Sequence, residues 1–170
     1  MVRRLCLLVG LVLLTSLPAH AQLFGDKIDL SGGYSYLRFR STPQASLNGY
    51  ELSGQYRVFP WLGGVADYGK NFGSIGGVSS SVSTYLFGAQ VSWPWPRRIS
   101  PFLRFMGGRA NFGGGGFYAG SWAEDGGFGV DMKWKHGFSW RLLEGDYLRT
   151  AFEGHTQGNI RVSTGIVFRF

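Results

Sequence analysis

Hydrophobic and polar residues alternate along most of the chain, and the alternation is clearest at its end. The apolar series there is Ile160, Val162, Thr164, Ile166, Phe168 and Phe170. The residues between them are Arg161, Ser163, Gly165, Val167 and Arg169. A period of two residues predicts a β-strand with one apolar and one polar face. At about 3.3 Å per residue, this strand is long enough to cross a bilayer at a tilt.

The same alternation recurs in seven other segments. The predicted strands are 28–36, 50–59, 83–93, 128–135 and 160–170 and, with weaker alternation, 62–70, 101–110 and 138–149. Outside the N-terminal segment, no window shows the three- and four-residue apolar spacing of an amphipathic helix. The pattern therefore predicts an all-β protein of eight strands.

Short connections alternate with longer ones between these strands. The short ones lie at 59–61, 94–100 and 135–137, and the longer ones at 41–49, 71–82, 111–127 and 150–159. Short turns at one end and long loops at the other are typical of a barrel of the outer membrane. We therefore predict an eight-stranded antiparallel up-and-down transmembrane β-barrel.

The distribution of side chains favours a barrel with a polar interior and an apolar outer face. Aromatic residues gather near predicted strand ends, as they do at the two interfaces of a membrane barrel: Tyr34, Tyr36, Tyr50, Trp61, Trp93, Trp95, Trp134, Trp140, Phe168 and Phe170. Side chains fill the interior of an eight-stranded barrel, so charges of both signs on the polar faces should pair there. The predicted lumenal charge network is Glu51, Arg57, Asp67, Arg104, Asp131, Lys133, Arg141, Arg161 and Arg169. A secreted soluble β-sandwich or lipocalin-like barrel is the alternative, because regular short strands fit it as well.

The N-terminal segment has the layout of a secretory signal peptide. Arg3 and Arg4 precede an apolar run, and Ala19-His20-Ala21 is a small-x-small cleavage site. Cleavage between Ala21 and Gln22 removes 21 of the 170 residues and leaves 149, which we predict to form one barrel domain over 22–170. The apolar run is shorter than a membrane-spanning helix requires, and charges and glycines interrupt every later stretch.

Composition narrows the class of protein further. Charged residues make up 16% of the chain, below the usual quarter or so, while aromatic residues also make up 16% and glycines number 28. This balance excludes a disordered linker. The single cysteine, Cys6, lies in the predicted signal peptide, so the mature chain has no disulfide and no cysteine-ligated metal. Losing Arg3 and Arg4 lowers the net charge from +7 to +5, and the basic residues are scattered. This charge suits anionic lipid headgroups better than nucleic acid.

The last strand resembles the closing strand of OmpA-like outer-membrane β-barrels. Further matching segments are Gly33-Tyr34-Ser35-Tyr36, Leu47-Asn48-Gly49-Tyr50, Trp61-Leu62-Gly63-Gly64-Val65-Ala66-Asp67, Gly129-Val130-Asp131, and Arg141 followed by Asp146-Tyr147-Leu148-Arg149-Thr150. The resemblance implies a Gram-negative outer-membrane protein whose Phe168 and Phe170 are recognised by the barrel-assembly machinery. The family often carries a peptidoglycan-binding domain after the barrel. This chain stops at Phe170, so we expect no wall-anchoring role.

The predicted seventh strand contains a conflict of parity. Arg141 and Asp146 are five residues apart, which places them on opposite faces of a regular strand. If both face the lumen, the strand must contain a β-bulge near Leu142 to Gly145.

Each candidate for chemistry has a simpler structural explanation. His136 is followed by Ser139, in the manner of an outer-membrane lipid A deacylase, but that enzyme's expected spacing is His-x-Ser. His155 and Glu153 supply too few ligands for zinc. The Gly113–Gly116 run is not followed by the Lys-Ser/Thr of a phosphate loop. We therefore predict no enzyme, with no catalytic residues, no cofactor and no metal.

The predicted function is a small integral outer-membrane protein with a structural or surface-interaction role. The alternatives are a lipid-modifying outer-membrane enzyme and a narrow pore for ions or small solutes. The expected partners are outer-membrane lipids, the barrel-assembly machinery and an extracellular ligand. That ligand would bind the outer loops through Phe117, Tyr118 and Trp122.

Overall fold

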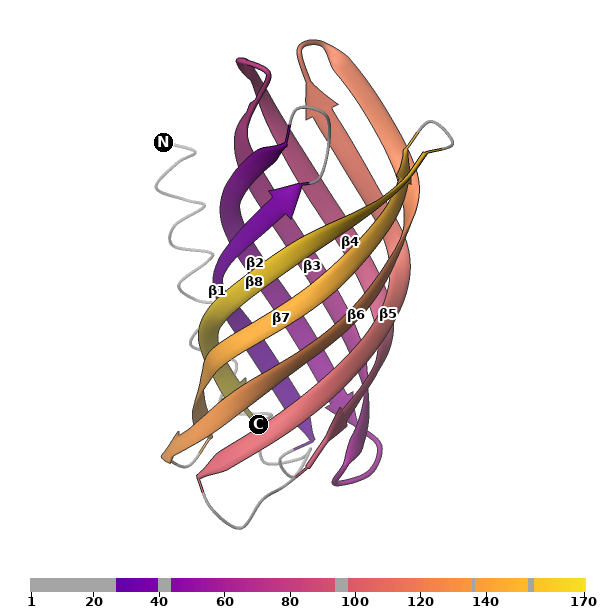
Figure 1. The fold of residues 1–170 in the computed structure, drawn as a ribbon. Helices are drawn as coiled ribbons and strands as arrows, with labels where there is room; N and C mark the ends of the chain where they lie inside the picture. The colour runs from indigo at the N-terminus through magenta and orange to yellow at the C-terminus, as the bar shows by residue number, and fades with distance from the viewer. Residues whose placement is uncertain (1–26, 40–43, 94–97, 136, 153–154) are drawn as a thin grey trace, which may run out of the picture.

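The computed structural model describes residues 27–39, 44–93, 98–135, 137–152 and 155–170, which form eight antiparallel strands. They are β1 (Ile28–Phe39), β2 (Ala45–Arg57), β3 (Leu62–Ile75), β4 (Val78–Ser92), β5 (Ile99–Gly114), β6 (Phe117–Lys135), β7 (Phe138–Phe152) and β8 (His155–Arg169). Each strand pairs with the next along the chain, and β8 pairs with β1, so the sheet closes into an up-and-down barrel (Figure 1). The predicted fold class is confirmed. The described residues contain no helix long and apolar enough to cross a membrane.

The last residue takes part in closing the barrel. The β1–β8 ladder runs from Asp29 opposite Arg169 to Arg38 opposite Ile160. Beyond it, the backbone N–H of Phe170 donates to the carbonyl of Ile28 at 2.8 Å. The N–H of Ile28 donates to the carbonyl of Phe170 at 3.1 Å. The whole length of the predicted closing strand is therefore used.

Two of the predicted long loops are tight hairpins instead. Gly76-Gly77 joins β3 to β4, and Gly115-Gly116 joins β5 to β6, with all four φ angles between 58° and 84°. Two consecutive positive φ values define the type I′ turn, which glycine adopts without strain. The loops predicted at 71–82 and 111–127 are therefore wrong, because strands continue on both sides of each glycine pair.

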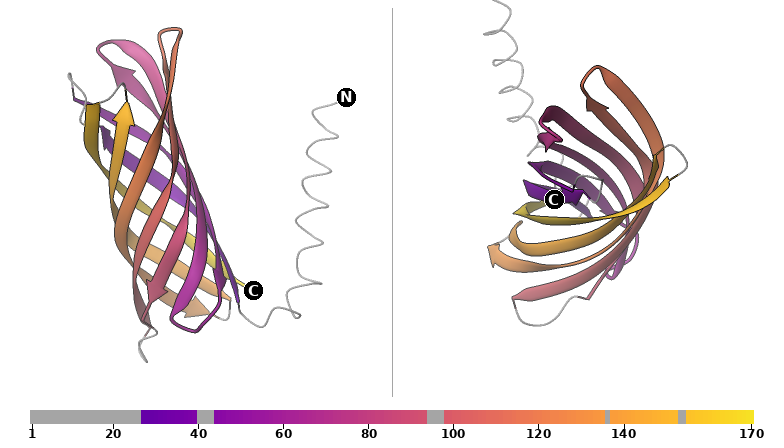
Figure 2. Two further views of the ribbon diagram at one scale, coloured as in Figure 1. Left: turned by 90° about the vertical axis from the view of Figure 1, so that its right-hand side faces the viewer. Right: turned by 45° about the horizontal axis from the view of Figure 1, so that its top comes forward.

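The other two predicted loops, 41–49 and 150–159, are also shorter than expected, since β2 begins at Ala45 and β7 continues to Phe152. All four of these connections lie at one end of the barrel, where the β3–β4 and β5–β6 hairpins project farthest (Figures 1 and 2). We call this the hairpin end. The opposite end, which holds Ile28 and Phe170, is the terminus end. The predicted signal peptide and its cleavage site lie outside the described residues.

Strands β1 and β8 approach each other closely at a pair of glycines. Gly33 and Gly165 are register partners. A Cβ on Gly165 would lie 2.7 Å from the Cα of Gly33, and a Cβ on Gly33 would lie 2.6 Å from the Cα of Gly165. Since both obstructing atoms belong to backbone, neither position has room for a side chain.

Gly165→Ala is therefore expected to lower the free energy of unfolding by about 1–3 kcal/mol, the usual cost of overpacking. Urea titration of the folded barrel in uncharged detergent measures this loss. Gly64→Ala is the matched control, because a Cβ there meets no atom within 4 Å. Equal losses in the two variants would contradict a tight β1–β8 seam.

Candidate functional site

Two buried arginines organise the charged centre of the lumen. Arg104 is 0% exposed and Arg161 is 1% exposed. The Nη2 of Arg104 donates to Glu51 Oε1 at 2.9 Å and to Asp146 Oδ2 at 3.1 Å, and it also pairs with Glu144. Arg161 donates from Nη1 to Asp67 Oδ1 at 3.0 Å and from Nε to Asp146 Oδ2 at 2.9 Å. The central cluster comprises Arg104, Arg161, Glu51, Asp67, Asp125, Glu144 and Asp146.

A second layer of charge lies beside the central cluster toward the terminus end. Arg141 donates from Nε to Asp131 Oδ1 at 2.9 Å and from Nη1 to Glu144 Oε2 at 2.8 Å. Its guanidinium also lies 4.4 Å from the ring centroid of Phe102, at cation–π distance. Glu144 therefore links this layer to the central cluster through Arg104.

A third group of charges lies at the terminus end of the lumen. Asp29 accepts from Arg169 Nε at 3.0 Å and also pairs with Arg57. Lys133 is half-buried and lies opposite Ser139 in the ladder. All nine residues of the predicted lumenal network are thus buried or half-buried.

The seventh strand contains the β-bulge that the parity of Arg141 and Asp146 predicts. In the ladders of β7 with β6 and with β8, the register shifts after Arg141. Leu142 and Leu143 both point outward, while Arg141 and Glu144 on either side of them are buried. The bulge lets β7 present three charged side chains to the lumen, including Asp146.

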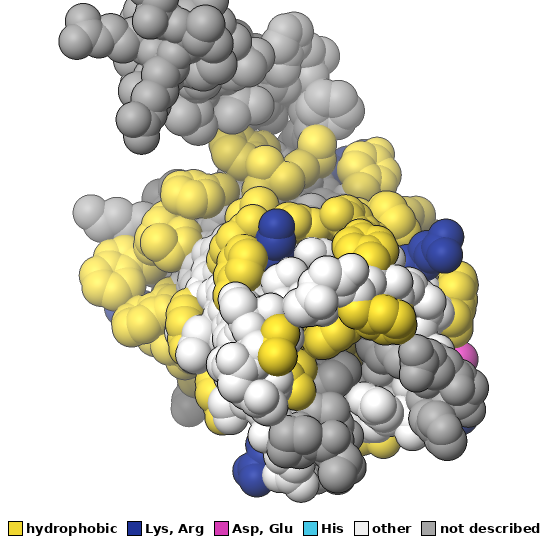
Figure 3. Space-filling model, turned by 90° about the horizontal axis from the view of Figure 1, so that it is seen from above, with side chains coloured by type: hydrophobic (Ala, Val, Ile, Leu, Met, Phe, Trp, Pro, Cys, Tyr) yellow, Lys and Arg dark blue, Asp and Glu magenta, His cyan; other side chains and the backbone are white. Residues whose placement is uncertain are grey.

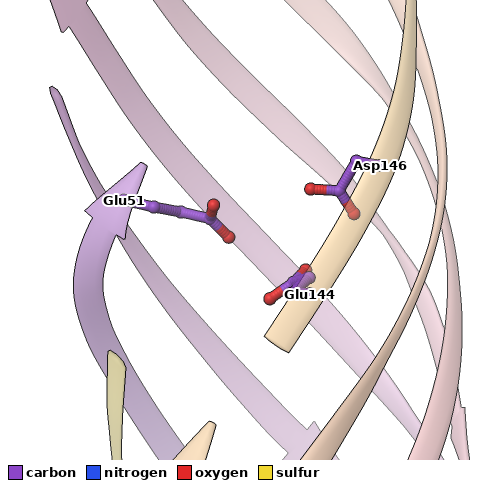
Figure 4. A group of neighbouring side chains, drawn as sticks. All are labelled: Glu51, Glu144 and Asp146. Carbon is purple, nitrogen blue, oxygen red and sulfur yellow. The ribbon is translucent and has the colours of Figure 1, made fainter. Parts of the chain in front are cut away.

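Three carboxylates of the central cluster have the spacing of a metal site. One oxygen each from Glu51, Glu144 and Asp146 lies within 4.8 Å of the others, and the side chains point toward one another in Figure 4. Nη2 of Arg104 pairs with all three of them. The guanidinium therefore accounts for the close approach of the carboxylates, and the arrangement is a set of ion pairs.

Apolar side chains fill the lumen between the central cluster and the hairpin end. This apolar plug consists of Leu37, Leu47, Val82, Leu86, Met106, Ala110, Ala123 and Leu148, with Ile75 and Phe112 packed against it. Met106 and Leu148 occupy the next inward positions after Arg104 and Asp146. The plug therefore packs directly against the hairpin side of the central cluster.

Most of the candidates for catalysis lie outside the part of the chain that the structure describes. His136 and Glu153 lie outside the described residues, as does the side chain of His155. Ser139 is buried and faces the lumen, whereas the deacylase comparison needs it on the outer wall. Gly113 and Gly114 belong to β5, and Gly115-Gly116 is the turn that follows.

The outer face of the barrel is apolar through its middle. Leu52, Phe87, Phe105, Phe128 and Leu143 come from five different strands and are 51–69% exposed. At the level of this band the charged residues of the same strands, among them Glu51, Arg104 and Asp146, are buried in the lumen. The apolar and charged faces are therefore inverted relative to a protein that meets water on the outside.

Aromatic side chains border this apolar band on both sides. The tyrosine ring, toward the hairpin end, comprises Tyr34, Tyr36, Tyr50, Tyr68, Tyr85 and Tyr147. Three of its members are close neighbours: the ring centroids of Tyr68 and Tyr85 are 5.0 Å apart, and those of Tyr50 and Tyr68 are 6.2 Å apart. The tryptophan ring, at the terminus end, comprises the exposed Trp61, Trp93, Trp134 and Trp140. Trp95 lies outside the described residues.

The three aromatic residues predicted as loop contacts are in a strand. Phe117, Tyr118 and Trp122 belong to β6, on the hairpin that projects farthest. Tyr118 and Trp122 are 74% and 62% exposed. They stand at the hairpin end as expected, but on a rigid ladder.

Comparison with known proteins finds similarity of fold alone. No family model matches the chain, and no curated protein matches its sequence. The fold is that of small outer-membrane barrels. Neisserial surface protein A superposes with a TM-score of 0.70 and 14% identity, over 84% of this chain and 97% of that one. Ail, the attachment invasion locus protein of Yersinia pestis, gives 0.54 and 14%, over 84% and 99%.

The N-terminal β-barrel domain of Pseudomonas aeruginosa OprF is a third neighbour, with a TM-score of 0.55 and 12% identity over 85% of this chain and 98% of that domain. The same eight-stranded architecture thus recurs in proteins whose sequences differ at most positions. These barrels share the backbone fold with the chain, but few of its side chains.

Proposed function

We propose that the chain is a small integral protein of the bacterial outer membrane with a non-catalytic, structural or surface-interaction role. One observation carries the proposal: the inverted surface, with ion-paired charges inside and a broad apolar band outside. A secreted soluble sandwich or barrel would need the opposite arrangement. A barrel in lipid must also hydrogen-bond the backbone groups of every strand edge internally. Pairing of β1 with β8 closes the sheet and meets this requirement.

Strand length supports a surface role at the hairpin end. A tilted strand needs about 9–11 residues to cross a bilayer. The strands contain between 12 residues, in β1, and 19 residues, in β6. The surplus forms the projecting hairpins, so Tyr118 and Trp122 would contact an extracellular ligand from a preformed surface.

The terminal aromatic residues fit a role in assembly. Phe168 is exposed on the outer face, and its ring lies 5.5 Å from that of Phe138. Phe170 is joined to Ile28 by two backbone hydrogen bonds. Since both residues lie on the strand that closes the barrel, we propose them as the signal read by the barrel-assembly machinery, as in the OmpA-like family.

The two alternative functions have less support. A narrow pore requires a water-filled path, but the apolar plug and the fully buried Arg104 lie across the lumen. A lipid-modifying enzyme requires a reactive group on the outer wall, and Ser139 faces inward.

The proposal predicts that the mature protein needs detergent for solubility and migrates differently on a denaturing gel before and after boiling. Closed barrels resist detergent because every strand is paired on both sides. The measurement is gel mobility of unheated and boiled samples, together with membrane fractionation. A protein that stays soluble without detergent would contradict the proposal.

A further inference from the structure

A tyrosine followed two residues later by a cation recurs in strands that run toward the hairpin end, at the point where each strand leaves the apolar band. Tyr36-Leu37-Arg38 in β1, Tyr68-Gly69-Lys70 in β3 and Tyr147-Leu148-Arg149 in β7 each place a cation two residues beyond a tyrosine. Because side chains two residues apart share a face of a strand, each cation points outward like its tyrosine. Strand β5 carries Arg109 at the equivalent outward position, opposite Tyr85 in the ladder.

These four side chains form a level around the barrel, which we call the basic ring: Arg38, Lys70, Arg109 and Arg149. They come from every second strand, β1, β3, β5 and β7, so they are spaced around the circumference. Viewed from the hairpin end, Lys and Arg side chains appear at several separate places around the molecule (Figure 3). Between the tyrosine and tryptophan rings, the described outward side chains carry no charge. The basic ring therefore marks the first charged level beyond the apolar band.

The charge at this level is mostly unneutralised. Among the described residues Glu124 is the acidic side chain at this level, and its Oε2 accepts from Arg149 Nη1 at 3.4 Å. Within the described part of the chain, Arg38, Lys70 and Arg109 form no ion pair. The Nζ of Lys70 lies 5.2 Å from the ring centroid of Phe72, a contact that leaves its charge without a counterion among the side chains that the structure describes. Three cations are thus available to anions from outside the protein.

The position of the four cations indicates which anions can bind to them. They project sideways from the wall, directly beyond lipid-facing residues, and not into the lumen or toward the hairpin tips. At this depth a membrane presents its headgroups, where tyrosine also resides. Arginine pairs with phosphate through two parallel hydrogen bonds, and lysine acts as a compact point charge.

We propose that the basic ring binds phosphate groups of lipids in the leaflet at the hairpin end, so that the barrel prefers a phosphorylated lipid and is held at a fixed depth. This inference rests on the proposed membrane insertion. Because the four cations lie on alternate strands around the barrel, each would contact a different lipid molecule. This arrangement favours a ring of lipid headgroups around the barrel over one multivalent soluble ligand.

The test uses the full mature chain, folded in micelles of uncharged detergent and titrated with fluorescent lipid A, a phosphorylated glycolipid. Lys70→Gln with Arg109→Gln is expected to weaken apparent affinity about thirtyfold, at roughly a factor of five for each cation near a headgroup surface. Lys27→Gln with Arg98→Gln is the matched control. It removes two exposed cations at the terminus end and should leave affinity within about twofold.

Three results would overturn the proposal: equal losses in the two double variants, wild-type binding of dephosphorylated lipid A as tight as that of lipid A, or displacement of lipid A by millimolar inorganic phosphate, which would point to a free anion. Gel mobility shift on heating reports folding of each variant separately. If the double variant fails to fold, the charge-preserving pair K70R and R109K must still bind lipid A. A wild type without the heat shift contradicts membrane insertion itself, whereas a heat-shifted wild type without lipid preference contradicts the basic ring alone.

Discussion

Arg104→Ala is expected to lower the free energy of unfolding by about 3–5 kcal/mol, the usual loss when one partner of a buried ion pair is removed. Arg104 is fully buried and pairs with Glu51, Glu144 and Asp146 through one nitrogen. Without it, Arg161 would be the one arginine within the central cluster, and Arg141 would reach only Glu144 from the neighbouring layer. Urea titration in uncharged detergent measures the change.

Arg149→Ala is the matched control for this prediction. Its pair with Glu124 is more than half exposed on both sides, and such pairs contribute less than about 1 kcal/mol. Arg104→Lys keeps the charge but loses the planar fork, so it should fall between the other two. A loss at Arg104→Ala no larger than at Arg149→Ala would show that the central cluster is not what stabilises the barrel.

Alternation alone identified the strands and most of the charges that turn inward. The pattern did not predict that Asp125 and Glu144 face the lumen, for two different reasons. Asp125 belongs to the part of β6 that was predicted as a loop, and Glu144 follows the bulge, where parity changes. Asp29 was visible on a polar face, but its pairing with Arg57 and Arg169 depends on the closed register of β1 with β2 and β8. Such partners are set by closure, which no local pattern encodes.

The upper parts of the strands were mistaken for loops because the polarity of the faces reverses there. Below the tyrosine ring most inward side chains are polar, apart from Val65, Phe102 and Val167, and the outward ones are apolar. Above it the plug residues Met106, Ala123 and Leu148 point inward, while Glu124 and Arg149 point outward. The hydrogen-bonded ladder is therefore continuous, although the alternation of apolar and polar residues in the sequence is interrupted. The Gly-Gly pairs between strand-forming residues were the available signal for the two hairpins.

Deleting Tyr147 is expected to prevent formation of the heat-modifiable barrel, because it shifts the parity of β7 by one residue. One outcome keeps the bulge and turns Arg149 into the apolar plug. The other removes the bulge and turns Glu144 and Asp146 toward lipid, where acidic side chains are destabilising, though by less than the roughly 2–4 kcal/mol of Arg or Lys at the bilayer midplane. Gel mobility of unheated samples and urea titration measure the effect.

Deleting Leu142 is the matched control, since it removes one residue from the same strand but at the bulge. Arg141, Leu143 and Glu144 then alternate regularly, in register with both β6 and β8 on either side of the deletion. All the charges of β7 still face the lumen, so this shortened chain should keep the heat-modifiable form. If both deletions fold, or if deleting Leu142 is the more damaging, the bulge is not the device that reconciles Arg141 with Asp146. If only the Leu142 deletion folds, the inward placement of charge is what sets the register of the seventh strand.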